Sequence, residues 1–130
     1  MTFSQAKDAL VAAYMEKAGR ALASMNRELD AGECDQAVSR AYFACFYAVS
    51  AVLVRDGHKF VKHTGVRSAL HLHLIRTGRV PAEMGRLYDE LFAGRGKADY
   101  DLASGFGSTE AHELAEQAEK FVKLLRGLPG

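Results

Sequence analysis

The sequence has few cysteines and none of the short motifs that hold metals, phosphates or activated nucleophiles. Its two cysteines, Cys34 and Cys45, lack the spacing of metal-ligand pairs, and Cys45 falls inside an apolar run. We therefore expect two reduced thiols, no metal and no cofactor. The absence of a glycine-rich phosphate loop and of a nucleophile elbow argues against the enzyme classes that depend on them.

The sequence also lacks a long hydrophobic run. The longest, residues 41–54, is broken only by Ser50 and is shorter than the roughly 20 residues that a bilayer span requires. Residues 1–5 show neither the basic nor the apolar region of a signal peptide. These features predict a cytoplasmic protein without a membrane segment, in which the apolar run forms a buried helix.

Charge is nearly balanced, but it is unevenly distributed. The net charge is +1, with 48% hydrophobic and 25% charged residues, which suits a single globular domain over residues 1–130. Residues 58–86, however, contain six Lys or Arg against one acidic residue, and four of the five histidines. This basic segment is either a solvated or partner-facing surface, or a surface that faces phosphate or RNA.

Apolar residues recur at helical spacing along the whole chain, and no segment shows sustained strand alternation. We expect an all-α fold, an up-and-down antiparallel bundle of four to five helices. The second helix is apolar nearly all round and should be central. The first helix should have an apolar stripe from Leu10 to Leu29 and end at Gly32, and the second should run from an Asp35 cap to about Gly57. The third should run from a Thr64 cap to Gly78. Val80-Pro81 should open the fourth helix, and the fifth should begin at Thr109.

The most distinctive polar segment is 95–100, Arg-Gly-Lys-Ala-Asp-Tyr. Arg95 continues the apolar stripe of the fourth helix one turn beyond Leu91, so its guanidinium approaches the core and needs a partner. Asp99, one turn further on, suits a bidentate contact, and Tyr100 adds a hydroxyl. Two interpretations stay open: an ion pair that orders the helix end, or a polar site for phosphate or RNA.

A second polar group precedes that segment. Arg40 and Tyr47 lie two turns apart along one face of the second helix. Lys62 and His63 start the third helix, whose first amides can hold an anion. His63 is either a capping or surface residue or, because imidazole titrates near neutral pH, a catalytic one. His71 and His73 point about 200° apart on a helix, so we do not expect them to share a metal ion.

Four segments follow the order found in HEPN-domain proteins. They are DQAVSRAYFA at 35–44, HTGV at 63–66, GRVP at 78–81 and RGKADY at 95–100. The chain resembles, from about residue 5 to 125, the branch of that family with an A-V-x-R-A-Y-Y-A helix, an H-x-G-V helix start and an R-x-x-A-D-Y segment. Phe43 stands where this branch usually has tyrosine.

The resemblance implies a helical bundle that usually dimerises and is often encoded beside a minimal nucleotidyltransferase as a toxin–antitoxin-like pair. Many members are metal-independent ribonucleases with an R-x(4–6)-H motif, whose arginine holds phosphate and whose histidine transfers protons. After Arg95, the positions for that histidine hold Tyr100, Asp101 and Leu102. A tyrosine with an ordinary pKa of about 10 is a poor base at neutral pH.

The leading prediction is therefore a non-catalytic or weakly catalytic HEPN partner protein. It binds nucleotide, RNA or a cognate nucleotidyltransferase through segment 95–100 and the basic segment 58–86. The residues assigned to nucleotide or RNA binding are Arg40, Tyr47, Lys62, His63 and Lys97. One alternative is an RNA endonuclease toxin with Arg95, Asp99 and Tyr100 as its catalytic centre. The other is a purely structural homodimer in which these residues order a helix junction.

Overall fold

The fold is built from helices. The computed structural model describes residues 1–60, 62–100 and 105–130, with the backbone alone for 96–100. Within these residues there is no strand, and the all-α prediction is confirmed. The elements are α1 (Phe3–Asp30), α2 (Cys34–Arg55), α3 (His63–Ala69), a π-helical segment η1 (Leu70–Ile75), α4 (Ala82–Tyr100) and α5 (Ser108–Arg126).

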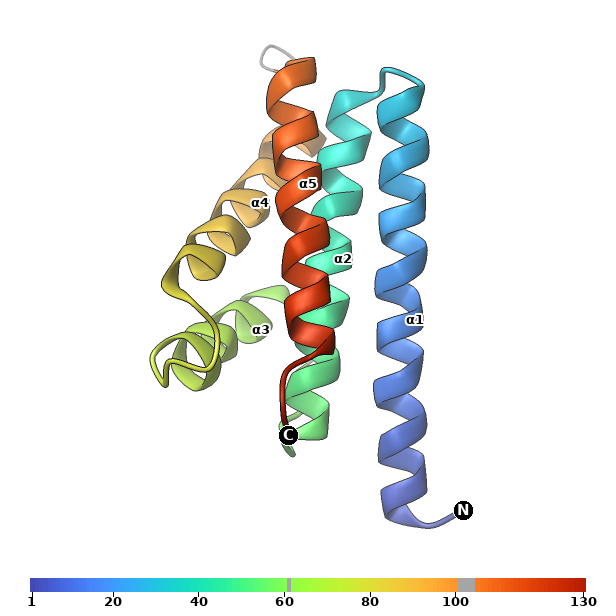
Figure 1. Ribbon diagram of the computed structural model, residues 1–130, viewed down its shortest axis with the longest axis vertical. Coiled ribbons are helices and arrows are strands. Elements are labelled where there is room, and N and C mark those ends of the chain that lie inside the picture. The colour runs from blue at the N-terminus through green and yellow to red at the C-terminus, as the bar shows by residue number, and fades with distance from the viewer. Residues whose placement is uncertain (61, 101–104) are drawn as a thin grey trace.

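The helices form an up-and-down bundle with one crossing segment (Figure 1). α1 and α2 are antiparallel neighbours, and α5 runs beside α2 in the same direction. Between them the chain leaves the bundle through the short α3 and η1, then returns through the tilted α4. The start of α3 and the end of α4 both pack against α2, and this arrangement positions the candidate site.

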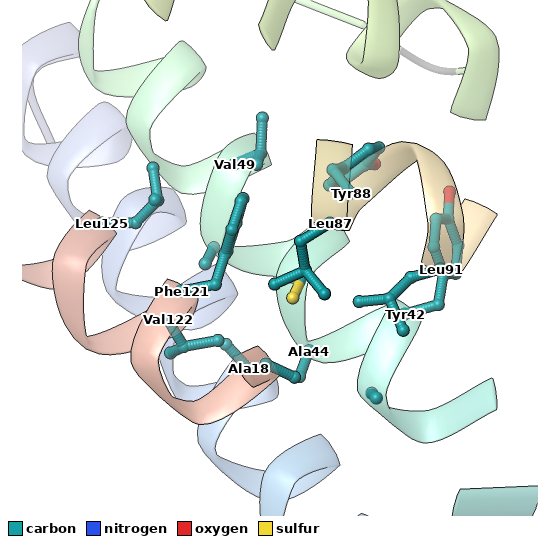
Figure 2. Packing of buried hydrophobic residues seen from close by; sticks show 14 of the residues in the cluster. Ala18, Tyr42, Ala44, Val49, Leu87, Tyr88, Leu91, Phe121, Val122 and Leu125 are labelled. Atoms are coloured by element: carbon teal, nitrogen blue, oxygen red, sulfur yellow. The ribbon is translucent and has the colours of Figure 1, made fainter. Parts of the chain in front are cut away.

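α2 is the central helix, as its apolar surface predicts. It packs against α1, α3, α4 and α5, and 12 of its 22 residues are buried. Five of the buried positions are alanines, which let neighbouring helices approach closely. Figure 2 shows how Phe121 and Leu125 of α5 and Leu87 and Leu91 of α4 converge on this helix.

The apolar run 41–54 lies within a longer helix, which is buried as predicted. By length and composition alone, the 22 residues of α2 would be enough to cross a membrane. In the bundle, however, 67% of its most apolar stretch is buried by other helices. The apolar surface of α2 therefore already has partners within the fold.

The predicted apolar stripe of α1 is buried only in part. Ala18, Ala21 and Met25 belong to the core, whereas Leu10 is 44% exposed. Leu10 lies beside the end of α2, where it lines a hollow with Val54 and Gly57. Figure 1 shows that α1 extends beyond this end of α2. A periodic pattern predicts which face of a helix is apolar, but not how far its neighbours reach.

Two of the predicted helix caps are wrong. Asp35 lies inside the first turn of α2, whose N-cap is Glu33, and its Oδ1 accepts a hydrogen bond from the backbone N–H of Phe106 at 2.8 Å. The carboxylate therefore ties the start of α2 to the segment before α5 instead of capping its own helix. Thr64 lies within α3, whose N-cap is Lys62 without a side-chain cap.

The predicted stops and the last helix agree well with the structure. Gly32, Gly57 and Gly78 adopt φ angles of 75°, 94° and 79°, which only glycine reaches easily. α5 begins at Ser108, one residue before the predicted start. Every predicted inward residue of α5 is buried, namely Ala111, Leu114, Ala115, Ala118, Phe121, Val122 and Leu125.

A close approach between α4 and η1 depends on Gly85. A Cβ at this buried position would lie 2.9 Å from Cε1 of His71 and 3.2 Å from Cγ1 of Ile75. Overpacking costs about 1–3 kcal/mol, and alanine returns at most about 1 kcal/mol in helix propensity. We therefore expect Gly85→Ala to lower the free energy of unfolding by about 1–2 kcal/mol in urea denaturation.

Gly19 in α1 supplies the matched control. Its added Cβ would meet only a terminal nitrogen of Arg126, at 2.9 Å, and that side chain can move away. Gly19→Ala should therefore raise the free energy of unfolding by up to about 1 kcal/mol. An equal change in the two variants would contradict the tight contact at Gly85.

Candidate functional site

The candidate site is centred on Arg95, in the last part of α4. The arginine follows the fully buried Leu91 by one turn, and its half-buried side chain turns back onto the core. Its Cζ lies 5.4 Å from the ring centre of Tyr42 and 6.0 Å from that of Phe43, both on α2. Its Nε is buried and has no hydrogen-bond partner among the described residues.

For the rest of segment 95–100 the structure describes the backbone, but not the side chains of Lys97, Asp99 and Tyr100. Residues 101–104 are not described. The predicted Arg95–Asp99 contact therefore lies outside the described residues.

His63, the first residue of α3, lies against the same part of α2. Its Nδ1 is 2.7 Å from the Tyr42 hydroxyl, a hydrogen-bonding distance. Its ring stacks on Phe46, with centroids 4.4 Å apart and planes inclined by 20°. The imidazole is thus half-buried in an aromatic cluster. His63 is thus neither fully exposed nor fully buried.

Arg95 and His63 share two aromatic neighbours. Tyr42 is hydrogen-bonded to the imidazole and lies under the guanidinium. Phe43 contacts His63 edge-on, with ring centroids 5.8 Å apart, and its ring also faces Arg95. Two helices that are distant in sequence therefore bring a guanidinium and an imidazole to one side of α2.

This environment keeps the imidazole neutral. Burial and, next, the positive charge of Arg95 lower the pKa of His63 below its ordinary value. Burial raises the pKa of Tyr42, so its hydroxyl stays protonated. The hydrogen bond thus joins two neutral groups, and the imidazole tautomer decides which of them donates. His63 Nε2 has no hydrogen-bond partner among the described residues.

One buried polar atom near Tyr42, Nε of Arg95, lacks a partner among the described residues. The hydroxyl of Tyr88 is also buried, but its ring centre lies 5.7 Å from that of Tyr42 and the two hydroxyls interact. A buried unpaired donor costs about 1–3 kcal/mol. Folded proteins rarely leave such a donor unsatisfied, so a polar partner at Nε of Arg95 would be stabilising.

A second guanidinium lies at the edge of this cluster, and the sequence analysis missed it. Arg67 Nε donates to Oδ1 of Asp89 at 2.8 Å, and its Cζ lies 5.0 Å from the ring centre of Phe92. Phe92 in turn packs edge-on against Tyr42. Arg67 follows His63 by one helical turn, which places both on one face of α3. This four-residue spacing could have identified Arg67 from the sequence.

The basic segment 58–86 is partly neutralised by its neighbours. Arg67 is paired with Asp89, and Arg79 with Asp56, each at 2.8 Å. Both carboxylates come from outside the segment. Lys62, predicted to bind nucleotide or RNA, is exposed at the N-terminus of α3, beside His63.

Arg40 and Tyr47 lie on the other side of Phe43. They line a groove of about 220 Å³ between α1 and α2, together with Lys17 and Arg20 of α1. The structure therefore brings these two predicted residues to one surface. Phe43 lies between this groove and the cluster around Arg95.

His71 and His73 have different partners, as their spacing predicts. His71 Nε2 lies 2.9 Å from Oδ1 of Asp89, while His73 stacks on His58 with ring centroids 4.2 Å apart. Among the described residues there is no group of three His, Cys, Asp or Glu side chains that could hold a metal ion.

Comparison with known proteins relates the chain to one family. Residues 11–128 match the HEPN domain. A UPF0332 protein of Thermotoga maritima is 36% identical over 92 residues, which are 71% of this chain and 70% of that protein. Two Methanocaldococcus jannaschii proteins also match. "Putative toxin MJ0142" is 30% identical over 83% of this chain and 74% of its own length. "Putative toxin MJ0605" is 31% identical over 69% and 66%, respectively.

Proposed function

Since the chain belongs to the HEPN-domain family, we propose that it is a toxin-like, metal-independent RNA endonuclease that uses Arg95 and His63. The observation that carries this proposal is the position of His63. The positions after Arg95 where the family's histidine falls hold Tyr100, Asp101 and Leu102. α3 supplies an imidazole to the same aromatic cluster from a different part of the chain.

Arg95 is suited to hold the phosphate at which cleavage takes place. Its guanidinium is permanently charged, and its buried Nε lacks a partner among the described residues. A phosphodiester gains negative charge on its non-bridging oxygens as it passes to the pentacoordinate state. A fixed guanidinium stabilises that charge more than it stabilises the ground state.

His63 is suited to move the proton of the attacking hydroxyl. When Nδ1–H donates to the Tyr42 oxygen, Nε2 carries a free lone pair and can accept the proton of a ribose 2′-hydroxyl. The 2′-oxygen then bonds to phosphorus, and the bond from phosphorus to the 5′-oxygen breaks. The imidazolium returns a proton to the departing 5′-oxygen. The products are a 2′,3′-cyclic phosphate and a 5′-hydroxyl, and Tyr42 serves as a positioning residue.

This proposal favours the first alternative from the sequence, an RNA endonuclease toxin, over the leading prediction of a non-catalytic or weakly catalytic partner protein. The prediction of a non-catalytic or weakly catalytic protein depended on the missing histidine. With His63 stacked on Phe46 and hydrogen-bonded to Tyr42, a proton-transfer group lies near Arg95. Two relatives are named putative toxins, which also favours a toxin-like endonuclease.

The direct test is RNA cleavage in the absence of free metal. End-labelled RNA would be incubated with purified protein in EDTA, and the product ends would be identified by their sensitivity to phosphatase and acid. We expect cleavage that leaves a 2′,3′-cyclic phosphate and that Arg95→Ala loses. If no RNA is cut, or if Arg95→Ala cuts as fast as wild type, the endonuclease proposal is overturned.

A cognate nucleotidyltransferase and a homodimer remain proposals that rest on the family resemblance. We expect a neighbouring reading frame with a Gly-Ser nucleotidyltransferase signature to encode a protein that co-purifies with this chain and suppresses its growth defect. Light scattering after size exclusion should give twice the monomer mass of 14.2 kDa. Co-expression without co-purification or rescue would argue against the paired module.

A further inference from the structure

We propose that the groove between α1 and α2 binds the unpaired nucleotides next to the cleaved phosphate, so that the substrate is single-stranded RNA. This inference rests on the proposed endonuclease function and extends it to the substrate. The groove combines positive charge with aromatic rings, and it borders the Arg95–His63 cluster.

The charge comes from both helices. Lys17 and Arg20 project from α1, and Arg40 projects from α2. Arg40 has no ion pair or hydrogen bond within the part of the chain that the structure describes. Arg20 is paired with Glu16, but both side chains are largely exposed, at 77% and 64%, so this pair is weak. Three cations around one groove suit a polyanionic backbone.

The aromatic surface is provided by Tyr47. Its half-buried ring is supported by Phe43, whose centroid lies 6.2 Å away, and by Tyr14 at 6.4 Å. The Lys17 ammonium lies 5.5 Å from the centre of the Tyr47 ring. A nucleobase that stacks on Tyr47 displaces this ammonium from the ring and frees it to contact the adjacent phosphate. Base stacking of this kind needs a base that is not already paired.

Phe43 connects the groove with the catalytic groups. It lines the groove beside Tyr47, and its ring also lies 6.0 Å from Cζ of Arg95 and 5.8 Å from the His63 ring. A strand that leaves the groove across Phe43 therefore reaches Arg95 and His63 within one or two nucleotides. A duplex cannot follow this path because its bases face inward.

The test measures binding separately from cleavage. The probe is a fluorescent 2′-O-methyl oligouridine of about 12 nucleotides, which lacks the attacking hydroxyl. We expect Tyr47→Ala to weaken its binding by about tenfold, the effect of losing one stacking partner. Tyr47→Phe should stay within about twofold of wild type because the ring is kept.

A charge variant keeps the test independent of folding. Lys17 is exposed, and Lys17→Ala should weaken oligonucleotide binding and lower the slope of log K against log salt by about 0.7. Lys123→Ala on α5 removes the same charge away from the groove and is the matched control. A duplex of the same length should bind more weakly than the single strand.

The outcomes distinguish this inference from the proposed function. If Tyr47→Ala and Lys17→Ala bind like wild type while Arg95→Ala loses cleavage, the groove is excluded and the endonuclease stands. If the groove variants lose binding but Arg95→Ala cleaves as fast as wild type, the groove stands and the endonuclease that uses Arg95 is excluded. If Tyr47→Ala instead converts a dimer to a monomer, the groove is an interface between two copies, which overturns the inference.

Discussion

Replacing Arg95 with alanine is expected to lower the rate of RNA cleavage by roughly 10²–10³-fold, the usual effect of removing one transition-state donor. Stability should change little, because Nε of Arg95 has no hydrogen-bond partner among the described residues. The main loss is the contact of the guanidinium with the Tyr42 ring, worth about 1 kcal/mol. Single-turnover cleavage and urea denaturation of the same preparations measure both effects.

Arg86 provides the control for this variant. It is exposed on the same helix, and the nine residues that separate it from Arg95 make two and a half turns, which place it on the opposite face. Arg86→Ala should cleave RNA like wild type, which would also exclude a contaminating nuclease. A large loss of stability in Arg95→Ala with unchanged RNA binding would instead support the interpretation that Arg95 only orders the helix end.

His63 is expected to contribute a comparable or larger factor. General acid–base groups contribute roughly 10²–10⁴-fold, so His63→Gln should lower the turnover number by that range. Glutamine is the informative replacement because it can keep a hydrogen bond to Tyr42 but cannot titrate. Alanine would also empty the stacking position on Phe46 and confuse packing with chemistry.

The pH profile separates proton transfer from a positioning effect. Because the pKa of His63 is lowered, its neutral form persists below pH about 6.5, the ordinary histidine value. Activity should therefore rise with pH along an acidic limb below that value and then level off, and the limb should vanish in His63→Gln. In an NMR titration, Arg95→Ala should raise the pKa of His63, since one cause of the depression is removed. An unchanged pKa would place Arg95 too far away to act with it.

The sequence predicts this structure well where the deciding pattern is local along the chain, and poorly where the deciding contact joins distant segments. The apolar face of α5 is correct residue by residue because helical periodicity is written within the helix itself. The Asp35 cap is wrong because its carboxylate bonds a backbone amide 71 residues away, in preference to its own helix end. Local cap rules do not include competitors from distant segments.

The same distinction holds for the site. Arg95 could be identified because its position follows from the apolar stripe of α4. His63 was recognised as a candidate, but its proximity to Arg95 depends on how α3 crosses α2, which one sequence does not encode in any local pattern. Arg67 was missed for a related reason, since its carboxylate partner, Asp89, lies on another helix.

The central position of α2 has a consequence for the synthesis of the chain. α2 leaves the ribosome after α1, but α4 ends only at Tyr100, and the surface that α5 covers waits for 71 residues after Arg55, until Arg126. At typical elongation rates this longer delay is roughly 4–14 s. Until α4 and α5 emerge, a 22-residue helix with the composition of a membrane span lacks the partners that cover those two surfaces. Chaperone binding to nascent chains that end before α4 should therefore be strong, and it should fall sharply once α5 has emerged.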